Sequence, residues 1–145
     1  MGAALFKGSS FLSIAPTING FISANEWPNP ISITLNGFNT ASLTRTADLY
    51  IAHTTTDLYV ALALADPTFS SVDVAEINLD TNHDHTATAG GEDALRYEDT
   101  GWSDLHWAGS DWARDAQQNG IAKATFGSNG YVYEFRKPLN SGDLN

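Results

Sequence analysis

The chain of 145 residues contains no cysteine, which excludes thiolate catalysis, cysteine-ligated zinc and iron–sulfur clusters. A chain of this length can bury enough apolar surface to fold as one domain without disulfides, so the absence of cysteine is silent on compartment. Basic residues are also scarce: seven lysines and arginines face seventeen acidic residues, for a formal charge of −10. Nucleic-acid binding is therefore disfavoured, because phosphate recognition depends on clusters of basic side chains.

Long apolar runs are absent as well. No segment approaches the ~20 apolar residues of a membrane-spanning helix, and we expect no membrane insertion. Residues 1–8 lack the basic-then-apolar layout of an export signal. The abundance of threonine, serine, asparagine and glycine nevertheless favours a secreted or extracellular protein whose signal has been removed. The alternative is a protein that is not exported.

No helical periodicity is sustained anywhere, and short alternating segments take its place. They predict strands over residues 31–37, 47–53, 57–65, 72–79, 94–97, 120–126 and 131–137. The segment 57–65 has apolar residues on both faces, which indicates a central strand. The pattern predicts an all-β, antiparallel β-sandwich of jelly-roll type. We assign it residues 16–145, with residues 1–15 as an N-terminal arm or an edge strand.

Oxygen-bearing side chains follow the predicted strand 72–79 at every second position. Side-chain and backbone oxygens gathered by a curled loop are the ligands that calcium prefers. We predict a structural Ca²⁺ bound by Asp80, Asn82, Asp84, Thr86 through its carbonyl, and Glu92 or Asp93. The loop is not an EF-hand, because His85 stands where that loop requires glycine. The alternatives are a solvated acidic turn and, because of His83 and His85, a transition-metal site.

Three tryptophans recur at intervals of five residues within sequence rich in glycine, serine and aspartate. Indole rings stack on the C–H faces of sugars, while polar side chains hydrogen-bond to the hydroxyls. We therefore predict a glycan-binding set of Trp102, Trp107, Trp112, Arg114 and Gln117, with Asp104, Asp111 and Gln118 flanking it. The alternative for any single tryptophan is core packing, which we expect for Trp27.

Catalysis is disfavoured, and we predict no catalytic residue. The chain has no Gly-x-Ser-x-Gly motif and no carboxylate pair in a recognisable glycosidase context. Haem binding is disfavoured too, because the only methionine is Met1 and His53 alone makes a poor axial ligand. Alternation places Glu76 and Glu134 on the surface of their strands, as surface charges or as ion-pair partners of Arg136 or Lys137.

An ordered set of short motifs resembles the family 9-like carbohydrate-binding modules and the related DOMON-type sandwiches. The motifs are Ile18-Asn19-Gly20, Glu26-Trp27, Asp57-Leu58-Tyr59-Val60-Ala61, Asp66-Pro67, Glu76-Ile77-Asn78-Leu79-Asp80, Gly130-Tyr131-Val132-Tyr133-Glu134-Phe135 and Pro138-Leu139. The resemblance spans roughly residues 17 to 143. It implies a jelly-roll sandwich, extracellular display, a structural calcium ion in many members, and sugar binding by aromatic side chains in some. Other relatives bind haem or serve as attachment domains.

The chain departs from this family at two places. Asn19 stands where the family usually has aspartate, and the chain stops at Asn145, whereas members continue for one or two further strands. We therefore expect a sandwich that lacks its final strands. Our first hypothesis is a calcium-stabilised carbohydrate-binding module that binds a polysaccharide or glycan beside the catalytic domains of a parent protein. The second is a structural subunit of an extracellular filament or surface layer, assembled with other copies of itself by strand exchange.

Overall fold

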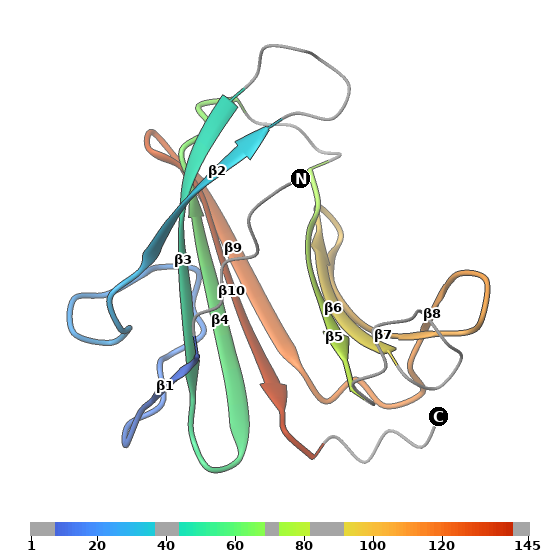
Figure 1. Cartoon of the computed structure of the whole chain (residues 1–145). Helices are drawn as coiled ribbons and strands as arrows, with labels where there is room; N and C mark the ends of the chain where they lie inside the picture. Colours follow the sequence, from blue (N-terminus) through green and yellow to red (C-terminus); the bar gives the residue numbers. More distant parts are fainter. Residues whose placement is uncertain (1–7, 37–43, 69–72, 82–91, 141–145) are drawn as a thin grey trace.

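The computed structural model describes residues 8–36, 44–68, 73–81 and 92–140, and these residues form strands and turns (Figure 1). No helix in this part of the chain is long and apolar enough to cross a membrane. The strands are β1 (Ser10–Phe11), β2 (Ile31–Asn36), β3 (Thr44–His53), β4 (Asp57–Leu64), β5 (Ala75–Asp80), β6 (Glu92–Glu98), β7 (Gly101–Trp107), β8 (Trp112–Arg114), β9 (Ile121–Gly127) and β10 (Gly130–Pro138).

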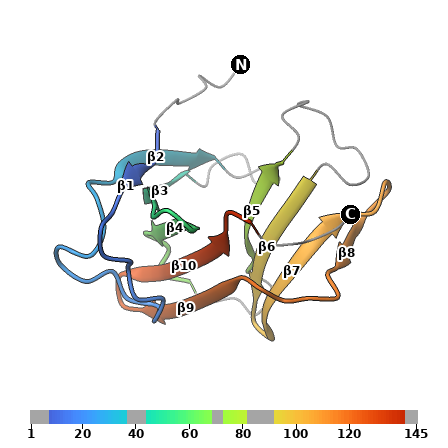
Figure 2. The same cartoon turned by 90° about the horizontal axis from the view of Figure 1, so that it is seen from below.

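Two sheets face each other in the manner of a sandwich (Figures 1 and 2). The six-stranded sheet has the order β1-β3-β4-β10-β9, and β2 also pairs with β3; the four-stranded sheet has the order β5-β6-β7-β8. Every pairing is antiparallel except that of β1 with β3. The all-β, antiparallel sandwich predicted from the alternating pattern is confirmed. So is the central place of residues 57–65, because β4 lies between β3 and β10.

The main core fills the space between the sheets on the side of β9 and β10. Leu95 of β6 is fully buried there and packs with Val60 of β4 and Phe135 of β10. Leu58, Leu62 and Leu64 pack against the same core. The inward-facing side of β4 thus follows the period of two expected for a strand.

A second, smaller core lies on the outer face of the six-stranded sheet. Tyr59 and Ala61, on the other face of β4, pack there with Trp27, which is 9% exposed as the expected core residue. Ile18 and Ile22, from the segment before β2, also pack against this core. The N-terminal segment therefore covers the central strands, which is why both faces of β4 are apolar.

This cover also buries Glu134 of β10, whose predicted surface position is wrong. Its side chain is fully buried, and Oε2 accepts hydrogen bonds from the backbone N–H groups of Asn19 (2.8 Å) and Gly20 (2.6 Å). Oε1 accepts a hydrogen bond from the indole N–H of Trp27 at 3.2 Å. Alternation alone misplaces the residue because it assumes that the outer face of the sheet is bare.

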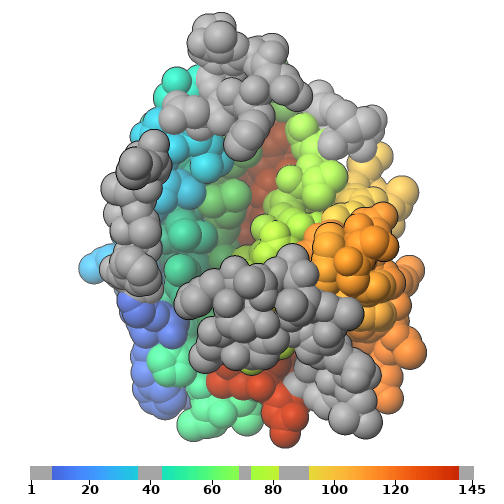
Figure 3. Space-filling view, turned by 45° about the vertical axis from the view of Figure 1, so that its right-hand side comes forward, coloured from blue at the N-terminus to red at the C-terminus, as the bar shows by residue number. Residues whose placement is uncertain are grey.

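The sheets diverge away from β9, toward β2 and β5. A groove with a volume of about 330 Å³ lies between them, and Figure 3 shows it as a hollow between the strands β2–β4 and β5. Its lining is mainly apolar and includes Leu35, Leu49, Leu62, Leu64, Val74 and Ile77. Leu35 and Val74 remain 39% and 54% exposed. Apolar surface is therefore left open on this side of the molecule.

Candidate functional site

The tryptophans of β7 and β8 separate onto the two faces of the four-stranded sheet. Trp102 is directly opposite Tyr97 on β6 and packs against the main core, so it faces inward. Trp107 lies five positions further along β7 and therefore faces outward. Trp102 thus packs against the core, as the alternative for a single tryptophan predicts, and on the opposite face of β7 from Trp107; its role in glycan binding stays a prediction.

Trp107 and Trp112 form a pair on the outer face. They are opposite each other in the β7–β8 register, and their rings meet edge to face with centroids 5.5 Å apart. Both side chains are half-buried, and Arg114 lies on the same face, two residues beyond Trp112. The indole N–H of Trp107 is buried and has no hydrogen-bond partner among the described residues. This part of the predicted set therefore forms one contiguous aromatic surface.

The loop after β8 is held by Gln118, whereas the predicted Gln117 is exposed beside it. The side-chain amide of Gln118 accepts a hydrogen bond from the backbone N–H of Asp104 and donates to the backbone carbonyls of Asp104 and Asp115, each at 2.8–2.9 Å. Gln118 is thus engaged in fixing the loop. Gln117 remains available to solvent near the end of β8.

The predicted calcium ligands are only partly described. Asn82, Asp84 and Thr86, together with His83 and His85, lie outside the described residues. Asp80 and Glu92 are opposite each other in the β5–β6 register, so their side chains share the outer face. Glu92 is 8% exposed, and neither of its carboxylate oxygens has a hydrogen-bond partner in the described structure. A buried carboxylate without hydrogen-bond partners lowers the stability of the fold unless a cation balances its charge.

Asp93 projects from the opposite face of β6 and contacts the ammonium group of Lys137. Its Oδ2 lies 2.8 Å from Nζ of Lys137, which also lies 2.6 Å from Oδ1 of Asp104. Strand alternation therefore separates Asp93 from Glu92, and only Glu92 can join Asp80 through its side chain. Asp104, taken from the sequence as a flanking residue of the glycan site, is fully buried in the core.

Asp115 completes a cluster around this lysine. One carboxylate oxygen from each of Asp93, Asp104 and Asp115 lies within 4.8 Å of the others. The imidazole Nδ1 of His106 lies 2.5 Å from Oδ1 of Asp115. Oδ2 of Asp104 also accepts long hydrogen bonds from two backbone N–H groups, those of residues 119 and 120. The ammonium group of Lys137, which is 3% exposed, supplies the positive charge that these buried carboxylates require.

On the outer face of the four-stranded sheet, an ion pair joins β5 to β6. Nε of Arg96 lies 2.5 Å from Oε2 of Glu76, directly across the register, and Nη1 lies 3.6 Å from Oε1 of Glu98. The hydrogen bond that Arg96 donates to Glu76 is the main cause that raises the pKa of Arg96. Glu76 is therefore an ion-pair residue as predicted, with Arg96 as its partner in place of Arg136 or Lys137.

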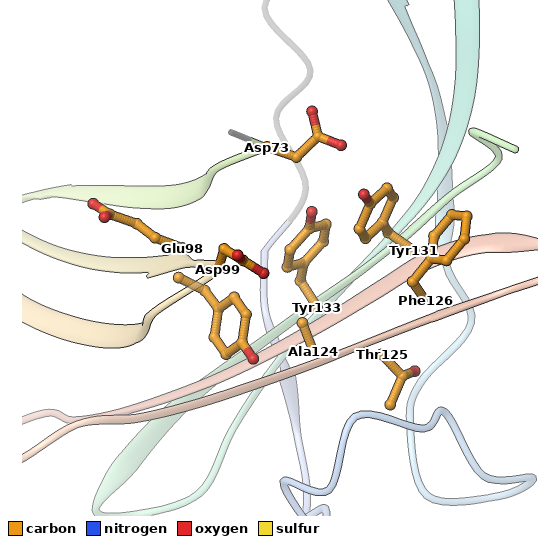
Figure 4. A pocket seen from close by; sticks show the side chains of 9 residues that line it. Asp73, Glu98, Asp99, Ala124, Thr125, Phe126, Tyr131 and Tyr133 are labelled. Carbon is orange, nitrogen blue, oxygen red and sulfur yellow. The ribbon is translucent and has the colours of Figure 1, made fainter. Parts of the chain in front are cut away.

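An aromatic cleft that the sequence analysis missed opens between the sheets, beside the β6–β7 turn (Figure 4). Its volume is about 100 Å³, and its lining consists of Asp73, Tyr97, Glu98, Asp99, Ala124, Thr125, Phe126, Tyr131 and Tyr133. The rings of Tyr131 and Tyr133 are nearly parallel, with an interplanar angle of 10° and centroids 5.4 Å apart. The signal in the sequence was the alternation of Tyr131 and Tyr133 on one face of β10, but the acidic residues come from elements far away in the chain.

Solved structures of a family 9 carbohydrate-binding module from Caldicellulosiruptor kristjanssonii share the fold of this chain. The complex with glucose matches with a TM-score of 0.60 and 22% identity, over 94% of this chain and 70% of that one. The complex with cellotriose matches with a TM-score of 0.57 and 20% identity, over 92% and 68%. No protein-family model and no curated protein matches the sequence. The fold expected from the resemblance to family 9 modules is thus confirmed, and the likeness to DOMON-type domains stays a prediction.

Proposed function

We propose that this chain is a non-catalytic, calcium-stabilised carbohydrate-binding module of an extracellular protein. The observation that carries the proposal is the pair of indoles, Trp107 and Trp112, on the outer face of a sandwich that shares its fold with sugar-binding modules. The two half-buried rings offer an apolar surface to the C–H face of a pyranose. Arg114, on the same face, can donate hydrogen bonds to hydroxyl groups.

The ligand class follows from this surface. A pair of indoles on the outer face of a sheet suits a chain of sugar units that passes across it, because the C–H face of a unit can stack on an indole ring. The structural neighbours were solved with glucose and with cellotriose, so a β-linked glucan is the first polysaccharide to test. A module of this kind would bring the catalytic domains of a parent protein to an extracellular polymer.

Binding of cello-oligosaccharides, followed by tryptophan fluorescence and isothermal titration, tests this proposal. We expect Trp112→Ala to weaken binding at least about tenfold, which corresponds to about 1.4 kcal/mol. Phe21→Ala is the matched control, because Phe21 is an exposed aromatic residue (61%) in the N-terminal segment. Equal losses in the two variants, or no response to a broad panel of glycans, would exclude the tryptophan site. Release of reducing sugars from these glycans would contradict a non-catalytic role.

The calcium part of the proposal rests on Glu92. Its buried carboxylate has no hydrogen-bond partner in the described structure and lies across from Asp80, so the chemistry of the donor set fits a hard cation. Asp80 and Glu92 would hold the ion from the two ends of the β5–β6 connection. Titration calorimetry should detect one Ca²⁺ site in the native chain and none in Glu92→Gln; equal binding by both would contradict this assignment.

A second candidate function is that of a structural subunit assembled by strand exchange. The apolar groove between β5 and the six-stranded sheet favours it, since an extended segment of a second copy would cover the exposed side chains of Leu35 and Val74. Sedimentation at rising concentration should then show polymers, which Val74→Asp should abolish. A monomer at every concentration would exclude this function.

A further inference from the structure

The aromatic cleft beside the β6–β7 turn differs chemically from the tryptophan surface. Among the nine described residues that line it, four are aromatic and three are acidic, and none of these nine is lysine, arginine or histidine. It lies between the two sheets, whereas Trp107 and Trp112 lie on the outer face of the four-stranded sheet. An aromatic wall with only negative charges beside it favours a positively charged ligand.

The aromatic wall is rigid because its rings support one another. Tyr133 is 4% exposed and makes an edge-to-face contact with Tyr97 at 6.1 Å, while Tyr131 is 6% exposed and contacts Phe126 at 4.7 Å. Phe126 is 40% exposed and forms the accessible end of the wall. Aromatic faces carry negative electrostatic potential, and a cation within ~6 Å of a ring centroid is attracted to it.

Two of the acidic residues have charges that none of the described residues balances. Glu98 contacts Nη1 of Arg96 at 3.6 Å, whereas the side chains of Asp73 and Asp99 make no ion pair or hydrogen bond within the described residues. Figure 4 shows the hydroxyl groups of Tyr131 and Tyr133 directed to the side on which Asp73 lies. Burial is the main cause that raises the pKa of Tyr133, and the negative charge of Asp73 adds to it. The carboxylates of Asp73 and Asp99 therefore give the cleft a negative potential.

We propose that this cleft binds a small organic cation, namely a quaternary or alkylated ammonium group. Its methyl groups would contact the rings of Tyr131, Tyr133 and Phe126, and Asp73 and Asp99 would balance its charge. The volume of about 100 Å³ is well below the ~300–1,000 Å³ of sites for drug-sized ligands, and it suits a head group better than a chain of sugars. The site is independent of the carbohydrate proposal.

Choline and its neutral isostere, 3,3-dimethylbutan-1-ol, are the probes that separate charge from shape. In NMR titrations at constant ionic strength, choline should shift resonances of Tyr97, Phe126 and Tyr131 and bind at least about tenfold more tightly than the alcohol. Phe126→Ala and Asp73→Asn should each weaken choline binding severalfold. Asp48→Asn, which removes one charge from β3 outside the cleft, should leave it unchanged.

Three results would overturn the proposal. Equally tight binding of the alcohol and choline would show that the cleft recognises only an apolar shape. Equal weakening by Asp48→Asn and Asp73→Asn would show a general effect of the net charge. Shifts of the cleft resonances by cellotriose in place of choline would assign the cleft to sugars. Loss of sugar binding in Trp112→Ala has no bearing on any of these outcomes.

Discussion

Lys137 is the residue on which the buried charges of the sandwich depend. Its ammonium group lies 2.8 Å from Asp93 and 2.6 Å from Asp104, and all three side chains are buried. Lys137→Met keeps most of the apolar stem but leaves these carboxylates without their cation. Breaking a buried pair in this way costs about 3–5 kcal/mol, so we expect a loss of this size in the free energy of unfolding measured with urea.

Lys123→Met is the matched control for this change. Lys123 lies on β9 with an exposed side chain, and its loss should change the free energy of unfolding by less than about 0.5 kcal/mol. If both variants unfold at the same urea concentration, the lysine at position 137 is not the counter-ion of the cluster.

Glu134 gives a prediction of pH dependence. Burial, the largest cause, raises the pKa of this carboxyl above its ordinary value, although hydrogen bonds from Gly20, Asn19 and Trp27 oppose the shift. The folded state then holds the proton more tightly than the unfolded state. The contribution of Glu134 to stability is therefore greatest below the ordinary glutamate pKa and falls as pH rises to the raised folded pKa.

Glu134→Gln isolates this effect, because glutamine keeps the shape of the side chain but does not titrate. The amide nitrogen of glutamine would place a hydrogen-bond donor where the native side chain has an acceptor. We therefore expect the free energy of unfolding to fall by about 1–3 kcal/mol at low pH. The advantage of the native chain over the variant should shrink as pH rises above 4.5, the ordinary pKa of a glutamate carboxyl. An advantage that grows with pH in urea titrations would show that the folded pKa is lowered.

Alternation in the sequence placed apolar residues correctly but not these charged ones. It assigned Val60 and Tyr59 to opposite faces of β4, as the structure confirms. Lys137 and Glu134 gave no such signal, because a charged residue in a strand is normally on the surface. Their partners lie 33 and more than 100 positions away, and only the folded topology brings them together.

At the scale of elements, the β9–β10 hairpin depends on a glycine. Gly130 has φ of +106°, and a Cβ added to it would lie 2.1 Å from the carbonyl oxygen of Leu64 on β4. Gly130→Ala must therefore strain the turn or move β4, and we expect a loss of more than about 2 kcal/mol in thermal or urea unfolding.

Gly127, at the other end of the same turn, provides the comparison. A Cβ added there would have no atom within 4 Å, and the residue has no positive φ, so Gly127→Ala should be nearly neutral. Equal destabilisation by the two changes would show that the hairpin as a whole, and not the approach of β4 to Gly130, limits substitution.

Most strands were predictable from alternation, and the exceptions have a physical cause. The predicted segments 31–37, 57–65 and 131–137 correspond to β2, β4 and β10. β7 and β8 were not predicted, because β7 directs the polar side chains of Asp104 and His106 inward. In the sequence these residues break the apolar alternation that marks a strand.

At the scale of the whole molecule, the candidate sites were only partly predictable. Trp107, Trp112 and Arg114 could be grouped from the sequence because they lie close together in it, and the paired strands β7 and β8 place them on one face. The aromatic cleft was not found, because its walls come from β6, β9, β10 and the segment before β5. A site assembled from distant elements leaves no local spacing that a single sequence can show.

The net charge of −10 sets the conditions for testing calcium in the intact molecule. Any cation reduces repulsion among the acidic residues, so the measurement belongs at about 0.15 M NaCl, where the Debye length is ~8 Å. Under these conditions, Ca²⁺ at ~100 times its Kd should stabilise the native chain by about 2.7 kcal/mol and raise Tm by roughly 5–10 °C. Chelation should reverse the shift, Glu92→Gln should abolish it, and Asp48→Asn should keep it. If Ca²⁺ and a matched increase in NaCl raise Tm equally, the ion only screens the surface, and Glu92 needs a different partner.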